Sequence, residues 1–493
     1  MKIKQISLCI SSILLCGCAL LGPKYKKPDV TTPNKWQESA TSTIINRNSV
    51  DVAKNPWWKK FNDQNLNNLM EEALANNNDI QSAIGNITVA AGNLQQVKMA
   101  WVPTLSAGGT YGIGQTFNTQ NSTNLQLPPG TSFSNNSGND FSFYSYGLIP
   151  SYSINVFQQI KKQDVANTNL ELAKANKDAV RLAIISQVSG SYFTLLALNS
   201  EIANQRSLVT HLSQLLNMVK IQHKYGLVTQ SDVVAAQQRL SQAKMQLPNM
   251  EHNLVVTQNA MQVLINNNSK KIGSTTEFSK IKIDGMIPVS LPSTVLESRP
   301  DIRISEYQLK IANDNIGVAK SNFFPKINLT TPIGAYSSQL GNLFNTSGDF
   351  WTAQITATMP ILNLGLYGLI KQTKGQYYIS YYNYIRTVKG AFADVNNNLS
   401  GYEKIQQSYT EALVNYDSAD SIAKLNQQNY KNGYISNQDN ISSQINADNA
   451  KILLDQTKLQ QLQAIISLYQ SLAAGYDYKN TNAPKEFGDD HDA

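Results

Sequence analysis

The sequence predicts a mainly α-helical chain, built twice on one plan, in which pairs of β-strands interrupt long coiled helices. Three observations carry this prediction. The regions 157–224 and 366–431 contain no proline and place apolar residues at steps of mostly three and four. Shorter segments alternate apolar with small or polar residues, which is the period of a strand. The two halves of the chain also match each other in order, which indicates an internal duplication.

Matching residues place the two copies along the chain. Three pairs mark the duplication at offsets of 222, 210 and 207 residues, namely Pro103 with Pro325, Pro150 with Pro360, and Gly226 with Gly433. The offset falls by twelve between the first two pairs, so the first copy has a longer loop there. We therefore expect a first repeat at 61–266, a linker at 267–297 and a second repeat at 298–475.

Each repeat contains the same succession of elements. A helix at 63–100 or 298–322 ends before a proline, which cannot continue a helix. Two strands follow in each copy, at about 104–117 and 141–154 in the first and about 326–336 and 350–361 in the second. The long helix comes next, roughly 100 Å in length at 1.5 Å per residue. A glycine turn then leads into a returning helix at 230–266 or 437–475, and Pro248 is expected to kink the first of these.

The first residues predict a lipoprotein. Residues 1–17 have the basic start and short apolar stretch of a signal peptide. The stretch ends in Leu15-Cys16-Gly17-Cys18, which resembles the bacterial lipobox. Cleavage before Cys18 would leave that residue as the only cysteine, carrying N-acyl and diacylglycerol lipid. Ala19 in place of an aspartate favours the outer membrane. The alternative is an ordinary secretory signal with Cys18 unmodified.

The strands carry a physical requirement for association. Four strands per protomer cannot close a membrane barrel, and an open sheet in lipid leaves unsatisfied backbone edges. Three copies would supply twelve strands around a wide lumen, with the polar face of the sheet inward. The helices are too polar for the bilayer and would continue the lumen as a periplasmic α-barrel. The alternative is a soluble β-sandwich element joined to a helical bundle.

Composition excludes several classes of function. The 493 residues carry a net charge of +7 without a basic block, which argues against nucleic acid as a partner. The charged fraction of 15% is low against about 25% in ordinary domains, so the surface is polar but largely neutral. Four histidines occur at no metal-binding spacing, and no phosphate loop or nucleophile elbow is present. We therefore expect no enzyme, no metal and no cofactor other than the lipid on Cys18.

Several motifs together resemble the TolC family of outer-membrane efflux proteins, in particular its lipoprotein branch associated with RND multidrug pumps. They are the lipobox, Gly22-Pro23, Tyr25-Lys26-Lys27-Pro28, Trp57-Trp58 with Asp63 and Leu66, Ser298-Arg299-Pro300-Asp301-Ile302, Ile316-Gly317 and Phe324-Pro325. The resemblance implies a homotrimer with a 12-stranded outer-membrane barrel and a long periplasmic α-barrel. It also implies an equatorial collar from 18–60, 267–297 and the tail at 476–493.

The same resemblance implies functional residues at the helix-hairpin tips. The family's adaptor-contact motif is matched by Gly226-Leu227-Val228-Thr229 and by Gly433-Tyr434-Ile435-Ser436. Its gate residues fall on Tyr430 and Asp439. This chain departs from the pattern at Ser442, where many members have a second aspartate, and at Ile435, where some have arginine. Alternatively, Asp439 and its counterpart Asp232 simply serve the first turns of the returning helices.

The expected function is passive export. Substrate would pass from an inner-membrane RND-type pump and a periplasmic adaptor through the trimer, as in multidrug resistance systems. Alternatives in the same class are a channel for type I protein secretion or for metal-cation efflux. From another class, the alternative is a trimeric coiled-coil structural lipoprotein, which would not conduct.

Overall fold

The computed structural model describes residues 22–30, 52–115, 140–272, 276–283, 299–344 and 348–480. The signal peptide and Cys18 lie outside these residues. The chain divides into two compact units. The first, here called the sheet unit, comprises Met1–Lys27, Val89–Glu171 and Tyr307–Tyr382, and the second, the helix unit, comprises Pro28–Thr88, Leu172–Glu306 and Asn383–Ala493. Each unit therefore takes segments from both predicted repeats.

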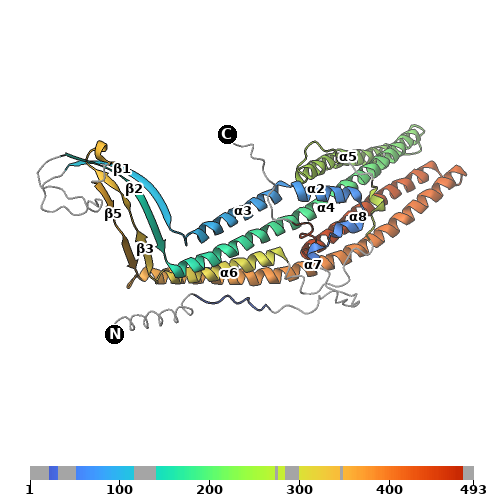
Figure 1. Cartoon of the computed structure of the whole chain (residues 1–493). Helices are drawn as coiled ribbons and strands as arrows, with labels where there is room; N and C mark the ends of the chain where they lie inside the picture. The colour runs from blue at the N-terminus through green and yellow to red at the C-terminus, as the bar shows by residue number, and fades with distance from the viewer. Residues whose placement is uncertain are drawn as a thin grey trace. The chain divides into compact units, whose positions relative to one another are not determined.

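The sheet unit holds one antiparallel sheet with the strand order β5-β4-β2-β3-β6, and β1 pairs with β2. Figure 1 shows this sheet at the left of the picture. Its strands are β1 (Thr104–Gln115), β2 (Asp140–Ile154), β3 (Lys326–Thr330), β4 (Ile333–Ser337), β5 (Asp349–Trp351) and β6 (Gln354–Thr358).

Two of the four expected strands are interrupted, so the prediction of continuous strands at 326–336 and 350–361 is wrong. The first breaks at 331–332, where Pro332 has no backbone N–H for the ladder. The second breaks at 352–353 and ends at Thr358, before Pro360. Backbone bonds still cross both breaks, from Thr331 N to Pro150 O (3.0 Å) and from Thr352 N to Pro332 O (3.1 Å). The chain therefore crosses the sheet four times with six strand segments.

The helices follow the predicted order. They are α2 (Gln64–Asn76), α3 (Asn78–Met99), α4 (Val156–Lys224), α5 (Gln230–Leu264), α6 (Pro300–Ser321), α7 (Leu364–Lys431) and α8 (Asn437–Ser471). The single helix expected at 63–100 is two helices, because the Asn77 side chain accepts from the amides of Asp79 and Ile80 and so caps α3. Helix α4 has 69 residues and α7 has 68, or about 100 Å each. Helix α5 continues through Pro248 as one helix.

The core of the helix unit gathers aromatic residues that the family motif contains. Trp57 and Trp58 are fully buried, and Trp57 stacks on Tyr469 with ring centroids 4.7 Å apart. Asp63 caps α2 through the amides of Asn65 and Leu66, and it also accepts a 2.6 Å bond from the Tyr192 hydroxyl. These residues hold the helix unit together, so the tryptophan pair has a packing role in its core.

Two further motif segments meet inside the sheet unit. Gly22 adopts φ +104°, and a Cβ there would lie 2.9 Å from the Gly317 Cα. The side-chain amide of Asn313 donates to the Pro23 carbonyl at 2.9 Å. The N-terminal segment can approach α6 this closely only because both residues at the contact, Gly22 and Gly317, are glycines. The segment leaving the predicted lipid site is therefore fastened to the sheet unit.

Candidate functional site

The sheet has two chemically opposite faces. Register places Ser153 opposite Asn328 and Asn328 opposite Thr356, and the Ser153 hydroxyl donates to the Asn328 side chain at 2.6 Å. Paired residues share a face, so one face carries Thr104, Ser151, Ser153, Asn328, Thr330, Gln354 and Thr356. The other face carries Tyr152, Ile154, Ile327, Leu329, Ile355 and Ala357. We call these the polar face and the apolar face.

The apolar face exposes large hydrophobic side chains. Ile113 is 74% exposed, Trp351 73% and Ile355 73%. Further large side chains on this face are at least 37% exposed, namely Leu105, Tyr111, Tyr146, Leu148, Ile327, Leu329 and Ile333. A soluble sheet buries such residues, and monomeric soluble proteins rarely expose so large a contiguous patch. The arrangement suits a sheet whose outer side contacts lipid.

A row of glycines crosses three neighbouring strands on the polar face. Gly108 pairs with Gly147, and Gly147 pairs with Gly334. A Cβ on Gly147 would lie 2.6 Å from the Ile333 carbonyl oxygen, and one on Gly334 would lie 2.1 Å from that of Tyr146. No side chain fits at Gly147 or Gly334, whereas Gly108 has open space, so glycine is what permits β2 and β4 to approach this closely.

Both long edges of the sheet lack a partner among the described strands. Strand β1 pairs only with β2, while β5 pairs only with β4 and β6 only with β3. Unpaired edges template further strand pairing. The described sheet is thus an open segment, with one apolar face and two edges available to other strands.

The first predicted tip is a well-defined turn between α4 and α5. The amides of Gly226 and Leu227 donate to the carbonyls of His223 (2.9 Å) and Gln222 (3.0 Å), which is a Schellman motif, and Gly226 has φ +75°. Thr229 then caps α5 in a capping box with Asp232. Bonds from the Thr229 hydroxyl and amide lower the pKa of Asp232. Leu227 remains 74% exposed at the end of the turn.

The second predicted tip, between α7 and α8, repeats this geometry. Gly433, with φ +77°, donates to the Tyr430 carbonyl at 3.0 Å, and the Tyr434 amide donates to that of Asn429 at 2.8 Å. Ser436 caps α8 and its hydroxyl donates to the Asp439 carboxylate at 2.7 Å. Both residues expected at the gate therefore belong to the turn itself, Tyr430 through its carbonyl and Asp439 through its carboxylate. Tyr434 is 77% exposed.

Side chains link the two hairpins near these tips, and the sequence analysis did not identify them. The Gln222 amide donates to Gln438 at 3.2 Å. Further along α4, the His211 Nδ1 lies 2.6 Å from the Asp448 carboxylate on α8, and only 22% of the histidine side chain is exposed. A histidine on a long polar helix is solvated by default, but a carboxylate from another helix covers His211. Neither pair has a periodic signal by which a sequence reveals it.

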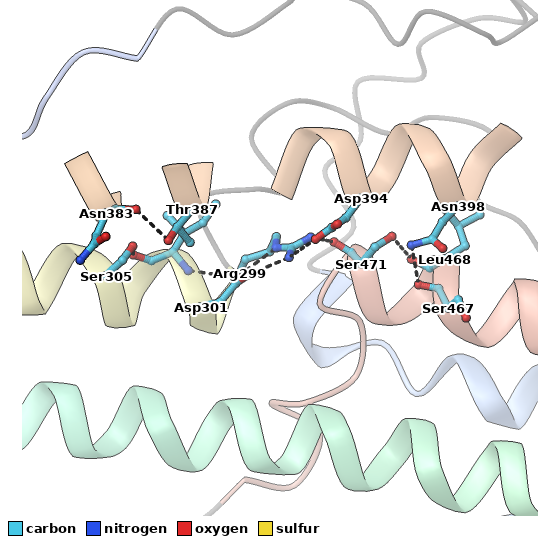
Figure 2. A network of polar contacts seen from close by, with 11 residues as sticks. Arg299, Asp301, Ser305, Asn383, Thr387, Asp394, Asn398, Ser467, Leu468 and Ser471 are labelled. Atoms are coloured by element: carbon cyan, nitrogen blue, oxygen red, sulfur yellow. Dashed lines mark hydrogen bonds and ion pairs between the residues drawn. The ribbon is translucent and has the colours of Figure 1, made fainter. Parts of the chain in front are cut away.

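A buried arginine ties three helix segments together at the other end of α8 (Figure 2). Arg299, 7% exposed, precedes α6 and makes a bidentate pair with Asp301 at 3.0 and 2.7 Å. Its Nη1 donates to the Ser471 carbonyl at 2.7 Å, and Nη2 lies 3.4 Å from the Asp394 carboxylate on α7. The planar guanidinium supplies this fork of donors. The Arg-Pro-Asp motif thus joins the first turn of α6 to α7 and α8 within the helix unit.

A family model described as "Outer membrane efflux protein" matches residues 69–267 and 291–474. The chain belongs to the outer membrane efflux protein family. It is 28% identical over 488 residues to the solvent efflux pump outer membrane protein SrpC of Pseudomonas putida, covering 97% of this chain and 99% of the relative. It is 27% identical over 500 residues to the cation efflux system protein CusC of Escherichia coli, with 96% and 99% covered.

The fold is also that of solved channels. The crystal structure of the Campylobacter jejuni CmeC outer membrane channel superposes with a TM-score of 0.77 at 22% identity, covering 94% of this chain and 96% of that one. This efflux protein therefore has the fold of known outer-membrane channels, as the motifs predicted.

Two further features of this efflux protein bear on its site. Among the described residues, no three His, Cys, Asp or Glu side chains gather as a metal site would require. Helix α4 contains one 18-residue window long and apolar enough to cross a membrane, although no such stretch was expected. Because 56% of that window is buried inside the protein, the window has the burial of a core helix.

Proposed function

We propose that this efflux protein is one subunit of a homotrimeric, passive exit duct. The four passes of each sheet contribute to a 12-stranded barrel in the outer membrane, and α4, α5, α7 and α8 build a periplasmic α-barrel. The duct itself performs no chemical reaction. An inner-membrane RND-type pump delivers substrate, and a periplasmic adaptor joins that pump to the tips.

The exposed apolar face of the sheet carries this proposal. A face lined by Ile113, Trp351 and Ile355 is costly in water and stable against lipid. The opposite face carries mainly glycine, hydroxyl and amide side chains, with a few aromatic residues and Lys326 among them, and this mixture suits a water-filled lumen. The sheet thus presents lipid on one side and water on the other.

The two open edges support the trimer. In a bilayer each unpaired backbone group costs several kcal/mol. The edge of β1 in one copy and the edge formed by β5 and β6 in the next remove this cost when they pair. Repeating the pairing around a threefold axis closes the sheet and leaves no edge.

The tips supply the proposed gate and adaptor contact. Leu227 and Tyr434 project from hydrogen-bonded Schellman turns, so their exposed side chains are available to an adaptor and the backbone that carries them is already ordered. Threefold symmetry brings three copies of Tyr430 and Asp439 around one axis. Like charges at short range repel, so a closed ring of Asp439 responds to pH and cations.

Conductance of the purified protein in a planar bilayer tests this function. We expect a trimer in detergent that conducts weakly. We expect Asp439→Ala to raise the conductance several-fold, because it removes the carboxylate that accepts from the Ser436 hydroxyl and so loosens the second tip, which outweighs the lost repulsion within the ring. Asp232→Ala is the matched control, because it removes the corresponding carboxylate from the first tip and should leave the conductance unchanged. A monomer, or a protein that never conducts even with Asp439→Ala, would contradict the duct. It would favour the structural lipoprotein instead.

The lipid anchor is a separate part of the proposal. We propose that Cys18 carries N-acyl and diacylglycerol lipid, which holds the N-terminal segment at the membrane. Radiolabelled palmitate should enter the wild type and Cys16→Ser, but not Cys18→Ser. Equal label in the two variants would show that the lipobox is not used.

The names of the relatives do not identify the kind of molecule that is transported, since one relative is named for solvent efflux and another for cation efflux. We propose small organic molecules rather than metal cations, because the described residues contain no metal-binding cluster. Drug accumulation in cells lacking the gene, compared with accumulation of copper or silver, separates the two. Type I secretion predicts loss of an exported protein instead.

A further inference from the structure

A polar cavity lies at the end of the sheet where β2, β3 and β6 approach α4 and the segment that follows α6. It is a cavity of about 690 Å³ in the sheet unit. Lys162 of α4 and Lys326 of β3 both line it, together with the hydroxyls of Ser153 and Thr358. None of the residues that line the cavity is acidic. The cavity therefore has a positive potential.

Strand register places this cavity on the polar face. Lys326 pairs with Thr358, and it shares its face with Asn328 two residues along β3. Ser153 pairs with Asn328 on the same face. In the proposed trimer the polar face is the lumen side, so the cavity opens toward the solute path. A lipid headgroup belongs to the opposite side of the sheet and is not the natural occupant.

Lys162 and Lys326 have no acidic partner among the described residues, in contrast to the neighbouring Lys161. Lys161 is paired with Asp164 at 2.9 Å and with Asp314 at 3.5 Å. Neither Lys162 nor Lys326 forms an ion pair with any residue that the structure describes. Two like charges facing one cavity repel each other, and a bound anion relieves that repulsion.

Each lysine of the cavity is present in only one of the two copies of the duplication. The duplication aligns Lys162 with Gln372 at the offset of 210 and Lys326 with Thr104 at the offset of 222. The equivalent positions carry neutral residues, which the same fold accepts. A trimer would present three copies of this cavity around its lumen.

We propose that this cavity binds oxyanion groups, phosphate or carboxylate, of solutes in the lumen, and that it gives the duct a preference for anionic cargo. The proposal rests on the trimeric duct. Lysine ammonium groups supply charged donors, and the Thr358 hydroxyl supplies a neutral one. A ring of six lysines without carboxylates raises the local concentration of anions and repels cations.

Calorimetric titration with inorganic pyrophosphate tests the site without requiring conduction. The full chain in detergent should bind pyrophosphate, and Lys162→Gln with Lys326→Thr should weaken binding about tenfold for each lysine removed. Higher salt should weaken binding to the wild type. Lys404→Gln, which removes an exposed lysine of α7 in the helix unit, is the control and should bind as the wild type does. Absent binding, or equal binding by the double variant, overturns the proposal.

Ion selectivity in a planar bilayer tests the consequence. In a potassium chloride gradient the double variant should shift the reversal potential toward cation selectivity, with the chloride-to-potassium permeability ratio falling at least about twofold. An unchanged ratio in a conducting channel overturns the proposed preference. A protein that does not conduct contradicts the duct, while the calorimetry still decides the anion site. The two failures are therefore distinguishable.

Discussion

Glu201 gives the sharpest test of the helix unit. This residue of α4 is 7% exposed, and burial raises its pKa from 4.5 to about 7, despite a bond from Gln456 that favours the ionised form. The nearby Asp455 adds repulsion, and its own carboxylate is paired with Lys451 at 3.0 Å. Lys458 donates instead to the carbonyls of Phe278 and Ser279. No described basic side chain forms an ion pair with Glu201.

The shift has a definite sign and size. The folded pKa lies above the unfolded value, so the folded state binds the proton more tightly. The resulting stability is fully present below pH 4.5 and is lost as the pH rises through 7. At about 1.4 kcal/mol per pKa unit, the rise from 4.5 to about 7 corresponds to at most about 3 kcal/mol lost at pH 8. Glu201→Gln stays neutral and avoids this loss.

Thermal unfolding of the purified protein, followed by circular dichroism at pH 5 and pH 8, measures the effect. We expect Glu201→Gln to melt about 5 °C above the wild type at pH 8 and within about 2 °C of it at pH 5. Glu411→Gln, at an exposed position of α7, is the control and should follow the wild type at both values. If Glu201→Gln and the wild type melt together at pH 8, the reasoning about an uncompensated buried carboxyl is wrong.

Three further predictions concern the contacts of Arg299, the second tip and the glycine row. Arg299→Met should lower the free energy of unfolding by about 2–3 kcal/mol, because it leaves the Ser471 carbonyl unsatisfied, whereas Asp394→Asn should cost under about 0.5 kcal/mol since that side chain is 59% exposed. Both are measured by the same melts. Gly433→Ala places a side chain at φ +77°, so limited proteolysis at the second tip should increase, while Gly401→Ala in mid-helix should not change it. Gly334→Ala should abolish the heat-resistant trimer on gels, whereas Gly341→Ala, with open space at its Cβ, should retain it. A stable Gly334→Ala trimer would contradict the role of the close strand contact.

Local patterns determined much of this protein. Period-two alternation placed β1 and β2, and proline-free apolar spacing placed α4 and α7, because side-chain periodicity follows directly from backbone geometry. Turn chemistry located both tips, since glycine at positive φ followed by Thr or Ser before a helix is a short-range signal. The duplication and the motifs predicted the family, and the family model confirmed it. The assigned roles of Tyr430, Asp439 and Cys18 stay predictions.

The sequence by itself determined the kinds of elements, their order and the family, because these depend on neighbouring residues. Only the tertiary structure decided which distant residues meet. It paired His211 with Asp448 and Arg299 with Ser471, across 237 and 172 residues respectively. It also brought Lys162 and Lys326 to one cavity and aligned three glycines across neighbouring strands. Such contacts are set by register and helix packing, which sum over the whole fold and leave no periodic trace in the chain.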